Sequence, residues 1–66
     1  MDMVRVNSSA FTAVGYDPAT GRMKIIFKQG SPYDYCHVPP NIYEGLMAAG
    51  SKGTYFARMI RDQYQC

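Results

Sequence analysis

The sequence has few of the residues from which active sites and metal centres are built. It contains one histidine, two cysteines and five carboxylates in 66 residues, and no glycine-rich loop stands between a strand and a helix, where phosphate loops lie. His37 adjoins Cys36, but neighbouring residues of a strand point to opposite faces and cannot work as base and nucleophile. A zinc site also needs more ligands than these spacings provide. We therefore expect no enzyme activity, no metal and no cofactor.

A long apolar run and a large charge excess are also missing. No run approaches the roughly 20 apolar residues that span a bilayer, so we expect a cytoplasmic protein without a membrane segment. The net charge of +2 is well below that of a dedicated nucleic-acid binder. Cys66 is the last residue, where chains usually fray. We therefore expect Cys36, a buried small thiol, and Cys66 to be free in a reducing compartment rather than joined in a disulfide.

The chain nevertheless has enough apolar and aromatic side chains for a folded domain. Hydrophobic residues make up 47% of it and aromatic residues 14%, which argues against disorder. A chain of this size buries only about 60% of the surface that its unfolded form exposes, so its stability is marginal. We expect a single domain over residues 1–66.

Apolar alternation predicts three strands, over residues 10–16, 22–28 and 33–38. The strongest turn signal, Asp17-Pro18-Ala19-Thr20-Gly21, joins the first two as a hairpin, because its aspartate can bond the following backbone and its last glycine accepts a positive φ. Residues 1–7 could add a short edge strand through Val4 and Val6. An unpaired edge invites a second copy, so we expect a monomer or a weak homodimer.

Two helices are predicted after Pro39-Pro40, which ends the third strand. The first spans residues 41–49, with Gly50 as a natural cap. The second spans residues 51–64, with the Ser51 hydroxyl as its N-cap. The apolar side of this second helix carries Tyr55, Phe56, Met59, Ile60 and Tyr64, and its opposite side carries Arg58 and Arg61.

The order of these elements predicts an α+β fold: a three-stranded antiparallel meander, with the extra edge strand if residues 1–7 pair, followed by two helices packed on one face. In the strand 22–28, Met23, Ile25 and Phe27 point to one face, and the cations Arg22, Lys24 and Lys28 point to the other. Charge on the wet face of a strand is usually no more than solvation.

Tyr33 and Tyr35 share one face of the third strand with His37, and the hairpin register decides which face that is. If Tyr33 pairs opposite Lys28, the rings interleave with Lys24 and Lys28, a pattern suited to stacking bases and following phosphates. If Tyr33 pairs opposite Phe27, the rings enter the core beneath the helices. Core packing is the commoner fate of aromatic residues in so small a domain, and we favour it.

Lys52 lies in the turn Gly50-Ser51-Lys52-Gly53 between the two helices. A lysine and free N–H groups at a helix N-terminus could contact a phosphate. A simple turn between helices accounts for the same residues, and we favour that interpretation.

The succession of motifs along the chain resembles the KTSC domain, a short module named from the C-terminal end of some lysyl-tRNA synthetases that also occurs as free-standing bacterial and phage proteins. The resemblance covers about residues 4 to 64. It rests on Ser8-Ser9, Val14-Gly15-Tyr16-Asp17, Tyr33-Asp34-Tyr35, Val38-Pro39, Ser51-Lys52-Gly53-Thr54-Tyr55-Phe56 and Ile60-Arg61. It implies RNA binding, with Tyr33, Tyr35, Lys52 and Arg61 as the matching positions.

Two hypotheses of function follow. The first is a small non-catalytic module that binds RNA, tRNA included, or other single-stranded nucleic acid. The candidate contacts are Lys24, Lys28, Tyr33, Tyr35, Lys52, Arg58 and Arg61. The second is a protein-interaction module that docks on a larger host or phage protein, since tyrosine and arginine are enriched at interface hot spots.

Overall fold

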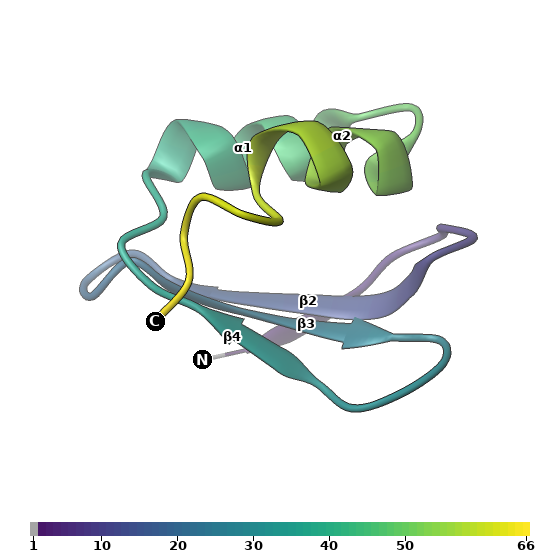
Figure 1. Cartoon of the computed structure of the whole chain (residues 1–66), viewed down its shortest axis with the longest axis horizontal. Helices are drawn as coiled ribbons and strands as arrows, with labels where there is room; N and C mark the ends of the chain where they lie inside the picture. The colour runs from purple at the N-terminus through teal and green to yellow at the C-terminus, as the bar shows by residue number, and fades with distance from the viewer. Residues whose placement is uncertain (1) are drawn as a thin grey trace.

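The computed structural model, which describes residues 2–66, is a four-stranded antiparallel sheet covered on one face by two helices (Figure 1). The strands lie in sequence order. The elements are β1 (Met3–Arg5), β2 (Phe11–Asp17), β3 (Arg22–Phe27), β4 (Tyr33–Tyr35), α1 (Pro40–Ala48) and α2 (Lys52–Met59). The α+β prediction is confirmed, and residues 3–5 of the segment 1–7 form the extra edge strand. Position 1 of that segment lies outside the described residues.

The hairpin between β2 and β3 forms at the predicted turn. The N–H of Gly21 donates to the carbonyl of Asp17 at 2.8 Å, and Oδ1 of Asp17 accepts from the N–H of Ala19 at 3.0 Å. Gly21 has φ +78°, in the region that glycine adopts without strain. The turn chemistry of this segment therefore sets the register of the central pair of strands.

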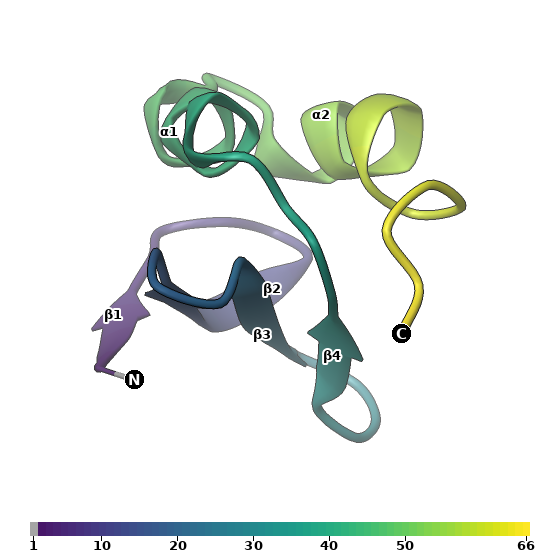
Figure 2. The same ribbon diagram turned by 90° about the vertical axis from the view of Figure 1, so that its left-hand side faces the viewer.

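The core lies between the sheet and the helices, and Figure 2 shows both helices on the same side of the sheet. Alternation along β3 sends Met23 and Ile25 into the core as predicted, and both are fully buried. The core side chains with no exposed surface are Phe11, Val14, Met23, Ile25, Leu46 and Ile60. Burial of each such side chain is worth roughly 1.5–3 kcal/mol, which makes this layer the main source of stability.

The register of β4 places both tyrosine rings on the helix side of the sheet. Tyr33 pairs with Ile25 and Tyr35 with Met23, two positions nearer the start of β3 than the register through Phe27. The face is nevertheless that of the core alternative, because a shift of two residues keeps every side chain on its side. The surface of tyrosines interleaved with Lys24 and Lys28 does not exist.

β4 is also shorter than the predicted strand 33–38. It ends at Tyr35, and His37 has φ +58°, outside the extended region. The backbone turns there toward α1, and the N–H of Val38 bonds the carbonyl of Gly21 at 2.8 Å. His37 is exposed and does not continue the tyrosine face, so the prediction that it shares that face was wrong.

The helices depart from prediction at their ends. α1 starts at Pro40, a position that needs no N–H, and its C-cap is Ala49 rather than Gly50. The Ser51 hydroxyl bonds the Thr54 hydroxyl at 3.0 Å instead of capping a backbone N–H. α2 ends at Met59, because the N–H groups of Ile60 and Arg61 both bond the Phe56 carbonyl and the chain then turns. Both helices are short, and within residues 2–66 none could cross a membrane.

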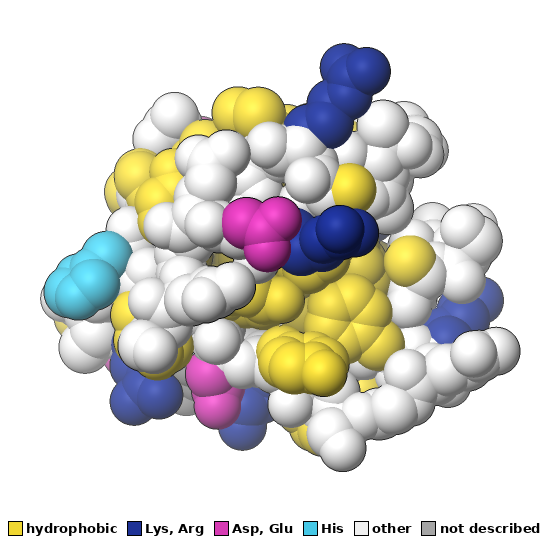
Figure 3. All heavy atoms as spheres, viewed as in Figure 1, with side chains coloured by type: hydrophobic (Ala, Val, Ile, Leu, Met, Phe, Trp, Pro, Cys, Tyr) yellow, Lys and Arg dark blue, Asp and Glu magenta, His cyan; other side chains and the backbone are white. Residues whose placement is uncertain are grey.

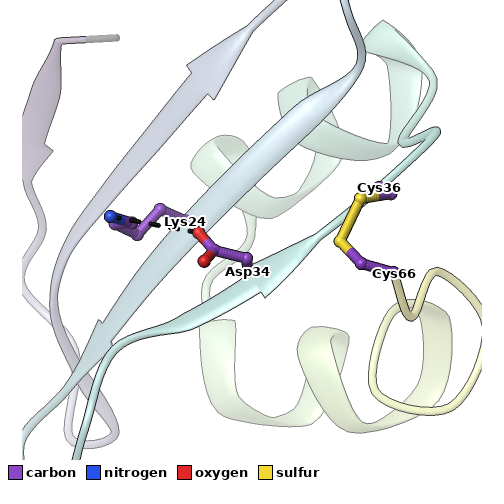
Figure 4. A network of polar contacts seen from close by, with 4 residues as sticks. All are labelled: Lys24, Asp34, Cys36 and Cys66. Atoms are coloured by element: carbon purple, nitrogen blue, oxygen red, sulfur yellow. Dashed lines mark ion pairs between the residues drawn. A yellow bond between two sulfur atoms is a disulfide. The ribbon is translucent and has the colours of Figure 1, made fainter.

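The last residues of the chain return to the sheet. Their position shows that our prediction for the cysteines was wrong. Cys36, just after β4, forms a disulfide with Cys66, at a Cα–Cα separation of 4.9 Å (Figure 4). We call residues 62–66 the C-terminal tail. It lies antiparallel beside β4, with a bridge between Tyr35 and Gln65. The expectation of free thiols was wrong because the turn after α2 directs residues 62–66 toward Cys36.

Candidate ligand-binding cleft

A cleft opens between the edge of the sheet, α2 and the C-terminal tail. Its volume is about 410 Å³, within the roughly 300–1,000 Å³ typical of small-ligand sites. Figure 3 shows apolar side chains exposed in this hollow, with acidic and basic side chains next to one another above it. The lining residues are Phe27, Tyr33, Asp34, Tyr35, Phe56, Arg61, Asp62 and Gln65. We call this hollow the aromatic cleft.

The floor of the aromatic cleft is a set of rings packed edge to face. Ring centroids of Phe27 and Phe56 are 5.4 Å apart, those of Phe27 and Tyr33 5.5 Å, and those of Tyr35 and Phe56 5.7 Å. Phe11 lies beneath, 5.3 Å from Phe27 and 5.6 Å from Phe56. Each such pair contributes about 0.5–1.5 kcal/mol beyond its buried area. The floor is therefore formed by contacts within the protein, without a ligand.

The two tyrosines of the cleft have different exposures. Tyr35 is 6% exposed and belongs to the core, whereas Tyr33 at the mouth is 59% exposed. Tyr33 follows the loop 28–32 and is the first residue of β4, the last strand of the sheet. One side of its ring therefore contacts Phe27, and the rest is exposed to solvent. This ring is the part of the floor that a ligand could cover from outside.

The polar rim carries both signs of charge. Arg61 Nε lies 3.9 Å from an oxygen of Asp62, and both side chains are largely exposed, so the pair is worth little. The side chain of Asp34 in β4 lies 4.0 Å from Lys24 in β3, its cross-strand partner, on the face of the sheet away from the helices (Figure 4). Burial raises the pKa of Tyr35, with smaller contributions from Tyr33 and Asp62 and an opposing one from Arg61. Its phenol is protonated at neutral pH and can donate a hydrogen bond.

The predicted site residues are only partly brought together. Tyr33, Tyr35 and Arg61 line the aromatic cleft. Lys28 lines an adjoining hollow that shares Phe27 with the cleft. Lys24 projects from the opposite face of the sheet, beside Asp34. Arg58 is exposed on the last turn of α2.

The side chain of Lys52 makes structural contacts with the end of α1. Its Nζ donates to the carbonyl oxygens of Met47 at 3.1 Å and Ala49 at 3.0 Å, at the end of α1. A cation there complements the partial negative charge of a helix C-terminus. The favoured interpretation of this segment, a turn between helices, agrees with these contacts.

Sequence reasoning missed Phe27 and Phe56 as cleft residues, because their strand and helix patterns mark them as core. It also missed Asp62 and Gln65, whose positions depend on the tail's return to β4. Among residues 2–66, no group of three or more His, Cys, Asp or Glu side chains is placed to hold a metal ion.

This fold and this site define a class of protein, a small α+β module with an aromatic cleft. The family model described as the KTSC domain matches residues 7–64, and the chain belongs to that family. The crystal structure of a KTSC domain protein from Yersinia pestis superposes with a TM-score of 0.95 at 32% identity, covering 98% of this chain and 92% of that one.

Relatives occur both as short proteins and within a larger enzyme. A protein of Tsukamurella paurometabola is 36% identical over 63 residues, which cover 96% of this chain and 94% of that protein. A lysine–tRNA ligase of Nostoc sp. is 35% identical over 63 residues, which cover 96% of this chain but 11% of the ligase. The resemblance in the sequence is thus confirmed at the level of the family.

Proposed function

We propose that this domain is a non-catalytic module that binds single-stranded RNA, with one unpaired base held in the aromatic cleft against Tyr33. The observation that carries the proposal is the half-exposed ring of Tyr33, packed edge-on against Phe27 beside the aromatic floor of the cleft. Stacking of a base on an exposed aromatic ring is worth about 1–3 kcal/mol and tolerates different bases.

The positions of the cations around the aromatic cleft support this proposal. Arg61 stands at the rim, and Lys28 lies in the hollow on the other side of Phe27. A strand with its base in the cleft would carry phosphates toward both, and Arg58 on α2 adds to the field beside Arg61. Lys24 and Lys52 take no direct part, because Lys24 is on the other face and the Lys52 ammonium bonds carbonyl oxygens.

The family supports the same class of ligand. Some relatives are named lysine–tRNA ligases, so a tRNA loop with unstacked bases is one source of the strand that we propose. Single-stranded loops are where proteins usually read RNA, since their bases can be splayed onto aromatic rings. We extend the proposal to a cytoplasmic location for this chain.

Fluorescence anisotropy with labelled bulk tRNA and a short single-stranded RNA, at about 50 and about 200 mM salt, tests the proposal. We expect saturable binding that weakens with salt, and a loss of about tenfold in affinity for Tyr33→Ala. Arg61→Ala and Lys24→Ala form a matched pair, because each removes one positive charge. Only the first should weaken binding beyond the general effect of charge.

A substitution of Asp62 distinguishes an RNA ligand from a protein partner. Asp62→Asn removes a negative charge beside Arg61, so RNA affinity should rise severalfold. No binding at low salt, or a fall in RNA affinity with Asp62→Asn, would reject the RNA proposal. The aromatic floor would then serve to dock a protein side chain, and partners that survive nuclease treatment would be the next subject of study.

A further inference from the structure

The aromatic cleft has one wall that the sheet and helices do not build. Asp62 and Gln65 line the cleft, and both belong to the C-terminal tail. Arg61 precedes them and is fixed by the bond from its N–H to the Phe56 carbonyl at 3.0 Å. The completeness of the cleft therefore depends on what holds residues 62–66.

Noncovalent contacts hold this tail sparsely. Its backbone bonds are one from the N–H of Cys36 to the Tyr64 carbonyl at 2.8 Å, one from the N–H of Gln63 to the Ile60 carbonyl at 3.1 Å and the single bridge between Tyr35 and Gln65. One exposed side-chain bond, from Gln63 Nε2 to the Arg58 carbonyl at 3.3 Å, adds to them. Tyr64 is half-buried against the core, and the other four residues of the tail are exposed. Segments with so little burial and so few hydrogen bonds open locally at low free-energy cost unless something ties them down. The Cys36–Cys66 disulfide is that tie.

The disulfide is open to chemistry, because Cys66 is exposed and Cys36 is half-buried. A dithiol reductant can attack one protein sulfur as a thiolate and form a mixed disulfide, which releases the other cysteine as a thiolate. The second thiol of the reductant then resolves the mixed disulfide. Two electrons and two protons pass to the protein, which ends with two thiols, and the reductant ends as its own disulfide. In the cytoplasmic location proposed above, disulfides are usually transient and either catalytic or redox-sensing.

We propose that Cys36 and Cys66 form a redox switch for the aromatic cleft. As a disulfide they hold the C-terminal tail in place as the wall of the cleft, and reduction releases the tail and removes that wall. This inference rests on the proposed function for its effect on RNA and for the cytoplasmic location. The release of the tail is a property of the chain alone.

The switch predicts weaker binding in the reduced protein. A wall that is already ordered adds no ordering cost when a ligand enters, whereas a released tail must be immobilised again or leave the cleft incomplete. We expect RNA affinity to fall about tenfold on reduction. The sheet and the two helices should stay folded, because the fully buried core side chains all precede residue 61.

The test uses the full chain, oxidised and treated with dithiothreitol, and the Cys66→Ser variant under both conditions. Amide hydrogen exchange reports on the tail without any RNA. We expect the N–H of Cys36, whose acceptor is Tyr64, to exchange much faster on reduction, while amides of β2 and β3 stay protected. Anisotropy with the short RNA gives the affinity of each form. Cys66→Ser should match the reduced protein and show no response to dithiothreitol.

Three results would overturn the switch. Equal protection of the Cys36 amide in both states would mean that the tail stays in place without the disulfide. A loss of protection throughout the sheet would make the disulfide a staple of the whole fold. A released tail with unchanged RNA affinity would show that it does not control the cleft. If RNA binds neither form, the proposed function fails, and hydrogen exchange still decides whether the tail is released.

Discussion

The ring of Tyr55 in α2 lies directly over Gly45 in α1, so that a Cβ at position 45 would stand 2.7 Å from Cζ of the ring. The Tyr55 hydroxyl oxygen would lie closer still to that Cβ, and this hydroxyl donates to the carbonyl of Ile42 at 3.1 Å. The glycine thus makes room for a hydrogen bond that joins the two helices. Its role is close approach, since its φ is not positive.

Gly45→Ala should destabilise the protein by about 1–3 kcal/mol, because the Tyr55 ring must move and lose its bond to Ile42. The same substitution in a Tyr55→Ala background should instead stabilise by up to about 1 kcal/mol, the helix-propensity gain of alanine over glycine. Urea unfolding of the four proteins gives this double-mutant cycle. A destabilising Gly45→Ala in both backgrounds would contradict the steric explanation.

Lys52 offers a second test, because its structural role and the phosphate contact suggested by the sequence predict different results. Lys52→Met keeps the apolar stem and removes the ammonium from the carbonyls of Met47 and Ala49. We expect a loss of about 1 kcal/mol in unfolding free energy, which is roughly 4–8 °C in Tm for a domain of this size. RNA affinity should change by less than about twofold, apart from the general effect of one charge.

Lys28→Met is the matched control for that experiment, since Lys28 is exposed and lies next to the cleft. It should leave the Tm almost unchanged and weaken RNA binding. If Lys52→Met weakens binding as much as Lys28→Met and leaves Tm unchanged, the phosphate interpretation of Lys52 is correct.

The burial of Tyr35 predicts that stability falls at alkaline pH. Its folded-state pKa is raised, first by burial and then by Tyr33 and Asp62, whereas the unfolded chain loses this proton near pH 10. Above that pH the folded state binds more protons than the unfolded state, so the free energy of unfolding decreases as pH rises through the folded pKa. Below pH 10 the contribution is fully present.

Urea unfolding at pH 9, 10 and 11 measures this decline, and Tyr35→Phe should make it shallower. The pKa of Tyr16 is also raised, by burial and by Glu44 and Asp17, but this residue is present in both proteins and its effect cancels in the comparison. An identical decline in the two proteins would mean that Tyr35 does not contribute to it.

Elements with local signals were predictable from the sequence. The turn at Asp17 and Gly21 carries its own hydrogen bonds and positive φ, and the alternation through Met23, Ile25 and Phe27 is set by the pleat of the strand. Pro40 marks the start of α1 for a reason that involves its own missing N–H. These features depend on neighbours in the chain, so the α+β order followed from them.

Features that depend on distant partners were not predictable. The pairing of Tyr33 with Ile25 depends on the length of the loop 28–32, and no residue of the two strands predicts this register. The aromatic cleft needs Phe56 of α2 beside Phe27 of β3, a tertiary contact between residues that each look like ordinary core. The end of α2 at Met59 likewise follows from the turn that takes the tail to Cys36.

The disulfide between positions 36 and 66 divides the oxidised chain into two parts that differ in covalent topology. Residues 36–66, which contain both helices, form a closed ring, and residues 1–35, which contain β1 to β4, form an open chain attached to it. One peptide-bond cut between 36 and 66 leaves a single molecule, because the disulfide still joins the two fragments, whereas a cut before 36 yields two molecules. In the oxidised form the helical half is therefore the part of the chain that can be broken once without being lost.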